Sequence, residues 1–401
     1  MKKSNDWLLS VTAGKWQSNG ILEAKKMGIN VIAVDGDKNA EGFKYADIYF
    51  SCDINDINYI IKKINSKNIK ISGAISFCSE VGMKSVNIIK NKLNLPCKNK
   101  FYMNLIDKIE QKTTWEKKSL PITKNWSYFS NFDEAYSYLK NLKTPYIIKP
   151  ADSSGSRGVA KISNNHDKIK TFLNNAFKYS NNSNIIIEDF IDGKEYAIEV
   201  FVINKKVNIL SISEKKKIKH TKGTVAKEYF SPKLNLSTQK KIKNLTESAV
   251  TSLKYANGPG HLEIIINKNN QPFLIEFAGR GGGFKVFDKF VPILSGVNLP
   301  KITILQSIGK KVKIKKIKRS RGIIRYFPAK KGKIKEINGI EKANKLSGII
   351  AESFVKKGDY VNKARSDGDR LGCIISFNKD FSTMKLNASK AEKIINFKFR
   401  I

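Results

Sequence analysis

Four charged residues lie in or beside apolar segments, where an ionised side chain is costly unless it meets a partner. Lys149 is near the end of one such segment, Glu263 and Glu276 interrupt two others, and Arg280 follows Glu276 by four positions. Two carboxylates together with phosphate oxygens make a hard-oxygen magnesium site, and a guanidinium stabilises negative charge on a phosphoryl group or an acyl phosphate. These residue types therefore predict chemistry at a phosphate.

A small loop follows Lys149 directly. It reads Asp152-Ser-Ser-Gly-Ser-Arg-Gly-Val159, and its backbone N–H groups can surround phosphate oxygens. The loop lacks the G-x-x-x-x-G-K-[ST] pattern of a P-loop, and a plain connection between two strands is the alternative. The phosphate-binding candidates in it are Ser153, Ser154, Gly155, Ser156 and Gly158.

The next polar feature is a turn between two apolar segments at 185–196. Backbone groups at Asp189 and Ile191 could pair with an adenine edge, and Glu195 could accept hydrogen bonds from ribose hydroxyls. A hairpin with surface acids is the alternative interpretation. The segment is therefore a candidate nucleotide hinge.

Two further strands are predicted at 260–266 and 272–280, linked by a polar turn at 267–271. A hairpin can bring Glu263 and Glu276 to one face, and strand alternation points Arg280 to the same side. His261 shares that face, where it either supports the site or serves as a structural histidine. The hairpin is thus expected to assemble the metal-binding and catalytic groups.

The elements that must position these groups begin with a β-α-β unit, which implies a parallel sheet. Ser18 or Asn19 is the predicted N-cap of its first helix, and Gly28 is the predicted terminator. G-x-G-x-x-G is absent, so a dinucleotide site is not expected, and Asp35 either binds a ligand hydroxyl or caps a turn. The predicted strands are 6–11, 30–35 and 72–78, and the helices after the second strand are 55–65 and 80–92.

The composition describes a folded chain with a basic surface. Hydrophobic residues make up 41 % of it, and no apolar run approaches the roughly 20 residues of a membrane span. The net charge is +39, but only eight of the 74 basic residues are arginine and the lysines are spread along the chain, which favours a solvated surface over a polyanion site.

The four cysteines form no C-x-x-C pair, which argues against a zinc site or a disulfide framework. With no signal-peptide pattern at the N-terminus, we expect a cytoplasmic protein that binds neither membranes nor nucleic acid.

Taken in order along the chain, the candidate residues resemble those of the ATP-grasp superfamily, in its carboxylate–amine ligase and biotin carboxylase branch. The ordered set is Lys108, Lys149, the loop 153–158, the hinge 188–191, Glu195, Glu263, Glu276 and Arg280. A late segment, Asp367-Gly-Asp-Arg-Leu-Gly372, resembles one in the last domain of that branch. The resemblance covers nearly the whole chain.

The resemblance implies an α/β and α+β multidomain fold. A Rossmann-like pre-ATP-grasp domain would cover residues 1–104 and an ATP-grasp domain 105–310, with subdomains of about 105–185 and 186–310. A small α+β domain would cover 311–401. The expected connections are Leu95-Pro96 with Lys98–Lys100, and the basic run Lys310–Arg321.

The resemblance also implies roles. Lys108 and Lys149 would contact ATP phosphates, and Glu263 and Glu276 would carry Mg²⁺, with Mn²⁺ as an alternative. Arg280 would act on the reacting group. The remaining ATP contacts would come from Glu188, Asp189 and Ile191 at the adenine and from Glu195 at the ribose.

One residue departs from the family pattern. The family often has E-x-N-x-R at the second metal strand, whereas Ala278 stands in the Asn position here, which could lower the affinity for a second ion. The segments 196–203 and 206–213 and the loop Lys215–Pro232 are expected to cover the acceptor side.

The reaction implied is ATP-dependent activation of a carboxylate as an acyl phosphate, followed by attack of an amine or a thiol and release of ADP and phosphate. A small-molecule carboxylate and amine would be the substrates, and a homodimer is left open. Two alternatives stay open as well: a biotin-carboxylase-like carboxylation, and a basic nucleic-acid-binding protein with a non-catalytic nucleotide fold. No biotinyl domain is visible in the sequence to support the first of these.

Overall fold

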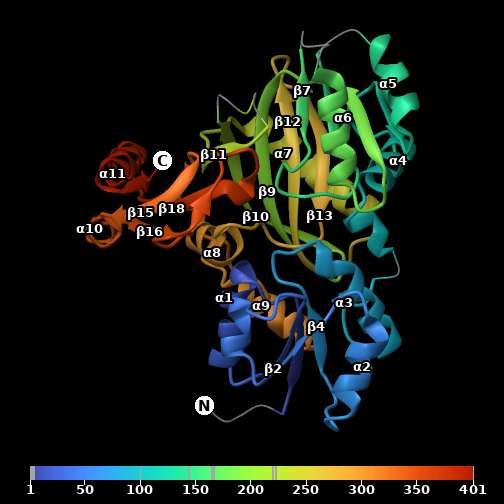
Figure 1. Cartoon of the computed structure of the whole chain (residues 1–401), viewed down its shortest axis with the longest axis vertical. Helices are drawn as coiled ribbons and strands as arrows, with labels where there is room; N and C mark the ends of the chain where they lie inside the picture. Colours follow the sequence, from blue (N-terminus) through green and yellow to red (C-terminus); the bar gives the residue numbers. More distant parts are fainter. Residues whose placement is uncertain are drawn as a thin grey trace.

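A computed structural model gives the fold of residues 5–99, 101–142, 145–163, 168–218, 221 and 224–400; Met1–Ser4 and Lys100 of the predicted connection lie outside these residues. Within this part of the chain the strands form four sheets. Figure 1 shows the N-terminal β/α unit at one end of the molecule and the C-terminal strands at the side of the largest sheet. No helix in these ranges is both long and apolar enough to cross a membrane.

The N-terminal unit is a parallel sheet in the order β3-β2-β1-β4, which confirms the predicted β-α-β unit. Its strands are β1 (Trp7–Val11), β2 (Asn30–Asp35), β3 (Ile48–Ser51) and β4 (Gly73–Ile75). Its helices are α1 (Lys15–Lys26), α2 (Ile57–Asn65) and α3 (Val81–Lys92), with short 3₁₀ turns η1 (Glu41–Tyr45) and η2 (Tyr102–Leu105). Helix α9 (Leu299–Ser307) of the later sequence also packs against this unit, beside α1 and β4.

Helix α1 starts earlier than its predicted cap. It begins at Lys15, with Gly14 as N-cap and no side-chain capping bond, so the prediction of Ser18 or Asn19 is wrong. The Ser18 hydroxyl instead donates to the Lys15 carbonyl inside the helix, at 2.8 Å. The predicted end is confirmed, because Gly28 follows the helix with a left-handed φ of +76°.

An antiparallel sheet in the order β5-β8-β6-β7 forms the second layer, and it carries Lys149 at the end of β6. Its strands are β5 (Trp126–Phe129), β6 (Tyr146–Pro150), β7 (Ala160–Ile162) and β8 (Ile185–Asp189). The helices in this stretch of the chain are α4 (Lys108–Lys117), α5 (Phe132–Lys140) and α6 (Ile169–Lys178). Alternate residues of the strands, among them Ile148 and Ile187, pack with α5 and α6 in one buried core.

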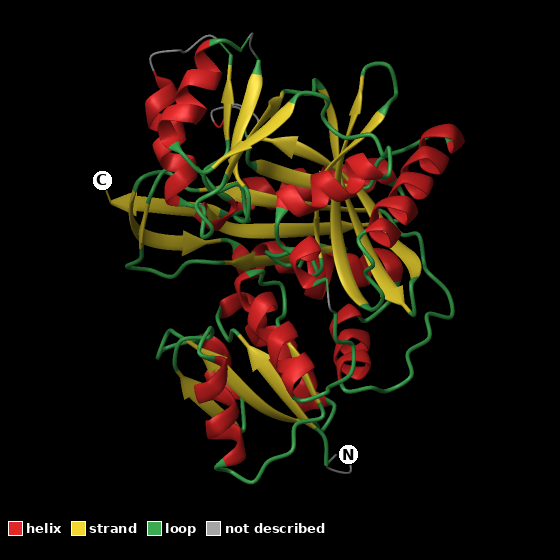
Figure 2. Ribbon diagram, turned by 90° about the vertical axis from the view of Figure 1, so that its right-hand side faces the viewer, coloured by secondary structure: helices red, strands yellow, loops and turns green. Residues whose placement is uncertain are grey.

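The largest sheet has eight antiparallel strands in the order β13-β12-β9-β10-β11-β14-β18-β16 (Figure 2). The strands before residue 310 are β9 (Gly193–Ile203), β10 (Lys206–Lys217), β11 (Ala226–Phe230), β12 (Gly258–Asn267) and β13 (Pro272–Ala278). The strands after it are β14 (Gly322–Pro328), β16 (Ile349–Ser353) and β18 (Arg370–Phe377). The other elements of this stretch are α7 (Leu236–Ser252), the π-helical turn η5 (Val286–Phe290) and α8 (Val291–Ser295).

A three-stranded sheet in the order β17-β15-β19 completes the C-terminal part. Its strands are β15 (Gly332–Asn338), β17 (Tyr360–Val361) and β19 (Asn396–Arg400), accompanied by α10 (Ile340–Asn344), α11 (Phe381–Ile394) and the 3₁₀ turn η6 (Asp367–Asp369). Because Glu228 of β11 pairs with Arg325 of β14, the large sheet continues across residue 310. The proposed domain boundary there therefore does not coincide with a break in the sheet, and the division into domains stays a prediction.

Three local predictions can be compared with this topology. The β12–β13 hairpin is confirmed. The plain hairpin considered for residues 185–196 is wrong, because β8 and β9 belong to different sheets and the turn between them connects two layers. The loop expected over Lys215–Pro232 is also wrong in part, since Lys215–Lys217 are the last residues of β10 and Ala226–Phe230 form β11.

Strand β13 lies at the edge of the large sheet, and α4 completes its hydrogen bonding. Gln111 of α4 donates from Nε2 to the Phe277 carbonyl at 2.6 Å and accepts from the Phe277 N–H at 2.8 Å. Gln111 is 1 % exposed, so water does not replace this pairing. The amide thus fixes the backbone next to Glu276.

Replacing this amide should destabilise the protein. In Gln111→Met, two buried peptide groups lose their partner, and the expected cost is about 1–3 kcal/mol for each. Urea unfolding measures the change, with Gln271→Met, in the exposed β12–β13 turn, as the matched control. Equal unfolding midpoints for the two variants would contradict the assigned role of Gln111.

Candidate functional site

A cleft of about 720 Å³ lies between the four-stranded antiparallel sheet, the eight-stranded sheet and the N-terminal unit, and every sequence-predicted site residue except Gly158 lines it. It draws Asp35 from the N-terminal unit, Lys149 from β6, Glu263 from β12 and Asp367 from the C-terminal part. Asp35 also accepts from the Asp37 N–H at 2.9 Å, which is the turn-capping role considered for it. Segments distant in sequence therefore meet at one place.

Lys149 shares a buried carboxylate with a second lysine. Its Nζ contacts Oε1 of Glu188, while Nζ of Lys112 in α4 lies 2.6 Å from Oε2. All three side chains are less than 10 % exposed. Burial raises the pKa of Glu188, but the two ammonium groups outweigh it and hold that pKa at about 2. Glu188 thus serves as the counter-ion of Lys149 at the cleft wall.

Lys108 is placed by the start of α4. Asp107 caps the helix by accepting from the Ile109 N–H at 2.7 Å. The Lys108 ammonium then donates to the Ser153 carbonyl at 2.7 Å and lies 3.2 Å from Oε2 of Glu276. Burial lowers the pKa of Lys108, yet Glu276 and other carboxylates raise it above its usual value. The lysine therefore connects the serine-glycine loop with the predicted metal site.

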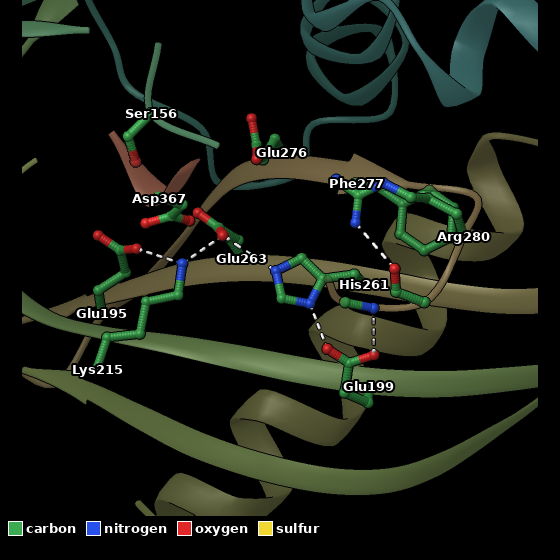
Figure 3. A network of polar contacts seen from close by, with 12 residues as sticks. Ser156, Glu195, Glu199, Lys215, His261, Glu263, Glu276, Phe277, Arg280 and Asp367 are labelled. Atoms are coloured by element: carbon green, nitrogen blue, oxygen red, sulfur yellow. Dashed lines mark hydrogen bonds and ion pairs between the residues drawn. The ribbon is translucent and has the colours of Figure 1, made fainter. Parts of the chain in front are cut away.

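Glu263 and Glu276 are direct cross-strand partners, as the hairpin argument predicted. Lys215 of β10 reaches between two acids: its Nζ contacts Glu263 and lies 2.7 Å from Glu195 (Figure 3). Burial raises the pKa of Glu263, but Lys215 and His261 hold it well below its usual value. Glu263 is therefore ionised, and Glu263 and Glu276 each lie beside a lysine ammonium group.

His261 continues the same network on the other side of Glu263. Its Nε2 lies 3.1 Å from Glu263, and its Nδ1 contacts Glu199 of β9, which also accepts from the Gly282 N–H at 3.2 Å. Burial lowers the pKa of His261, but the two carboxylates raise it to about 9. The histidine is thus a charged link between β9 and the hairpin (Figure 3), which is a supporting role.

Arg280 lies just beyond β13 at the edge of the cleft. Its Nη1 donates to the Gly281 carbonyl at 2.9 Å, and its Nη2 contacts Glu80, the N-cap residue of α3. Burial lowers the pKa of Arg280, but the nearby carboxylate of Glu80 and other groups together raise it more, so the pKa of Arg280 lies above its usual value. The N-terminal unit therefore supplies the counter-ion that positions this guanidinium.

The serine-glycine loop is held from three directions. Gly155, Ser156 and Gly158 have left-handed φ angles between +61° and +73°. The Ser156 hydroxyl donates to the Thr224 carbonyl at 2.9 Å, and the Asp367 N–H donates to the Gly155 carbonyl at 3.0 Å. The predicted C-terminal segment 367–372 therefore reaches the cleft and contacts this loop.

The hinge residues occupy the far wall of the cleft. The Asp189 N–H donates to the Asn125 carbonyl at 3.0 Å, so an adenine edge would use other backbone groups of this turn, such as Ile191. Glu195 lies 2.7 Å from Lys215 and 2.8 Å from Lys217. Burial raises its pKa, but these two lysines lower it, and Glu195 stays an ionised acceptor.

Sequence reasoning missed four charged residues of the site: Glu80, Lys112, Glu199 and Lys215. Lys215 carried a usable signal, because it lies two and four positions after Ser213 and Ser211 on one face of a long strand. The other three have partners 62 to 200 positions away along the chain. No local pattern marks such pairs.

The acid pH dependence of stability tests the Lys112–Glu188–Lys149 arrangement. Because the pKa of Glu188 falls from 4.5 to about 2 on folding, its contribution is complete above pH 4.5 and is lost as the pH falls toward 2. Glu188→Gln should lower the free energy of unfolding by about 3–5 kcal/mol at pH 7, because two buried lysines lose their partner. The difference from the unchanged protein should shrink below pH 4.5.

Urea unfolding from pH 7 to pH 2.5 measures this. Asp192→Asn is the control, since it breaks the exposed pair with Lys268 and should leave the midpoint unchanged. A Glu188→Gln deficit that is independent of pH would show that the carboxylate is not the charge that matters.

Comparison with known protein families agrees with this geometry. The family model described as ATP-grasp domain matches residues 142–288, and the model described as L-amino acid ligase C-terminal domain 2 matches residues 325–400. The first range contains Lys149, the loop, the hinge and the hairpin, and the second contains Asp367. The two matched ranges thus account for most of the cleft.

Two curated relatives were found over part of their length. D-alanine–D-alanine ligase of Buchnera aphidicola subsp. Schizaphis graminum is 31 % identical over 207 residues, which is 48 % of this chain and 65 % of that protein. L-arginine-specific L-amino acid ligase of Bacillus subtilis is 24 % identical over 269 residues, or 65 % and 64 % of the two chains. The chain thus spans just under two thirds of each of these relatives.

The fold is also shared with solved structures. L-amino acid ligase from Bacillus licheniformis superimposes with a TM-score of 0.83 at 19 % identity, over all of both chains. Phosphoribosylglycinamide synthetase from Anaerococcus prevotii gives 0.74 at 23 % identity, over 99 % of this chain and 100 % of the other. The chain thus contains an ATP-grasp domain at residues 142–288, and its fold agrees with that match.

Proposed function

We propose that this protein is an ATP-dependent ligase that activates a carboxylate as an acyl phosphate and joins it to an amine, with ADP and phosphate as products. The observation that carries the proposal is the pairing of Glu263 with Glu276 in a cleft that also holds Lys108, Lys149 and Arg280. Hard oxygens, ammonium groups and a guanidinium are the groups that phosphoryl transfer requires. The relatives named as ligases support the same reaction class.

ATP would lie along the cleft from the hinge to the hairpin. Its adenine would meet backbone groups near Ile191, its ribose would meet Glu195, and its phosphates would lie beneath the loop 153–158, next to Lys108 and Lys149. The loop already contacts Lys108 through Ser153, so movement of the loop and placement of the phosphates would be coupled. Closure over the phosphates would exclude water from a reactive acyl phosphate.

Glu263 and Glu276 fit a magnesium ion. Both are carboxylates that line the cleft, and both lie beside lysine ammonium groups, which supports a cation at this position. In the described ranges no third His, Cys, Asp or Glu completes a protein-only metal site, which suits an ion that keeps water and phosphate ligands. Bound Mg²⁺ would supply positive charge to the ATP phosphates.

The chemical steps then follow from the charges of the chain. An oxygen of the substrate carboxylate attacks the γ-phosphorus, the bond to the ADP oxygen breaks, and Arg280 stabilises the charge on the transferred group. The amine nitrogen next attacks the acyl carbon, phosphate leaves, and the nitrogen loses a proton. Lys215 and His261 hold Glu263 in position while this happens.

We further propose that both substrates are amino acids. The C-terminal segment matches the L-amino acid ligase domain model, and its Asp367 contacts the loop that would cover ATP. A screen of ADP release across pairs of L-amino acids tests this class first, and other carboxylates and amines follow. Substrate-dependent ADP release with no new amide in the products would contradict the ligase assignment.

The phosphate contact of Lys149 predicts a loss of ATP affinity. Lys149→Met keeps the buried stem and removes a charged hydrogen-bond donor, which should weaken ATP binding about 10–100-fold. Isothermal titration with a non-hydrolysable ATP analogue measures the change, and exposed Lys140→Met is the control. Equal affinities in the two variants would mean that the phosphates lie elsewhere.

Separate variants distinguish metal binding from chemistry. Glu276→Gln should abolish turnover and make the remaining nucleotide binding insensitive to Mg²⁺. Arg280→Ala should keep Mg-nucleotide binding near normal and reduce turnover roughly 10²–10³-fold. Partly exposed Glu247→Gln and exposed Arg319→Ala are the matched controls. Full activity in Arg280→Ala would end its catalytic assignment.

A further inference from the structure

A second cavity, of about 560 Å³, lies on the other side of Arg280 from the cleft. It is formed by β4 and α3 of the N-terminal unit, the connection after α3, the segment 251–259 and the end of α9. Among the residues that the structure describes, only Cys78 and Arg280 line both cavities. Its volume falls within the range of about 300–1,000 Å³ that is typical of small-molecule sites.

The charges around this cavity all have one sign. Its lining residues include no Asp or Glu, whereas they include five cations: Lys90, Lys98, Lys205, Lys254 and Arg280. The wall between the cations is largely apolar, with Phe77, Met83, Val86, Leu105 and Phe287. A site with this lining favours a ligand that carries a negative group on an apolar body.

Lys90 is the lining cation beside which a bound negative group would be most favourable. It extends from α3, is partly buried, and its hydrogen bond in the described part of the chain is a weak one, 3.5 Å from the Cys97 carbonyl. Burial lowers the pKa of Lys90, and no carboxylate contributes to the shift. An anion within reach would offset this desolvation.

Two buried donors in the lining add a second, independent observation. Nδ2 of Asn99 and Nε of Arg280 are buried and have no hydrogen-bond partner among the residues that the structure describes. Asn99 is held in place from its other end, because its Oδ1 accepts from the Phe101 N–H at 2.8 Å. Buried donors without acceptors are rare, and acceptor oxygens of a ligand would complete them.

We propose that this cavity binds a small organic acid: a carboxylate attached to an apolar body, with the carboxylate near Lys90 and Asn99 and the body against Phe77 and Val86. The site is separate from the ATP cleft. Because Arg280 lines both cavities, a ligand here would contact the residue that positions the transferred group. The acid would be either a reactant of the enzyme or a separate effector, and both have the same chemistry.

Calorimetric titration with 4-phenylbutyrate, in the presence of a saturating non-hydrolysable ATP analogue with Mg²⁺, tests the site directly. The expected result is one saturable site whose dissociation constant rises at least about tenfold in Lys90→Met. Lys84→Met, an exposed lysine on the same helix and outside the lining, is the matched control and should bind as the unchanged protein does. The uncharged amide, 4-phenylbutanamide, should bind at least about tenfold more weakly than the acid.

A second variant covers the case in which Lys90→Met does not fold. Thr251 is an exposed lining residue, so Thr251→Trp should narrow the cavity without entering the core and should also weaken binding. Cys97 gives a local readout: 4-phenylbutyrate should slow its alkylation by N-ethylmaleimide while leaving Cys52, which is outside the lining, unchanged.

Several results would overturn the proposal. They are equal affinities in Lys90→Met and the unchanged protein, displacement of 4-phenylbutyrate by the ATP analogue, or no saturable binding up to roughly 10 mM. Once an acid substrate is known, competition between it and 4-phenylbutyrate would identify the cavity as a reactant site, and a change in turnover without competition would identify an effector site. This binding test does not depend on the ligase proposal, since it requires no turnover.

Discussion

The requirement that buried charges neutralise one another governs this structure. Glu188 lies between Lys112 and Lys149, Glu276 lies beside Lys108, and Lys215 lies between Glu195 and Glu263. Removing Glu188 would leave two buried ammonium groups without this partner, which is far more costly than breaking a surface pair. The network therefore constrains where the sheets and α4 can lie relative to one another.

The same constraint suggests how the site would respond to its substrates. The lysines that balance Glu263 and Glu276 occupy positions where a cation would bind, and Lys108 and Lys149 are the groups that phosphates would attract. A magnesium–nucleotide complex brings both signs of charge, so it can exchange partners with the network without leaving a charge unpaired. In the proposed site, binding of this complex would thus replace existing ion pairs.

Much of the framework could be predicted from the sequence, because local patterns encode it. The strand at 30–35, the Gly28 terminator and the 260–280 hairpin follow from alternation and turn residues, and the cross-strand pairing of Glu263 with Glu276 follows from the hairpin. The start of α1 was missed because Ser18 bonds within the helix instead of capping it. The pairs Arg280–Glu80 and His261–Glu199 could not be predicted, since they join strands and helices whose approach is decided by the tertiary fold.

The central claim is that the cleft directs a substrate carboxylate oxygen onto the γ-phosphorus of ATP. The most direct measurement uses amino acids labelled with ¹⁸O in the carboxyl group and mass analysis of the inorganic phosphate released during amide formation. The acyl phosphate route predicts that each phosphate released carries one ¹⁸O atom from the carboxylate. Amide formation with unlabelled phosphate would contradict it, because the phosphoryl group would then never have been bonded to the carboxylate oxygen.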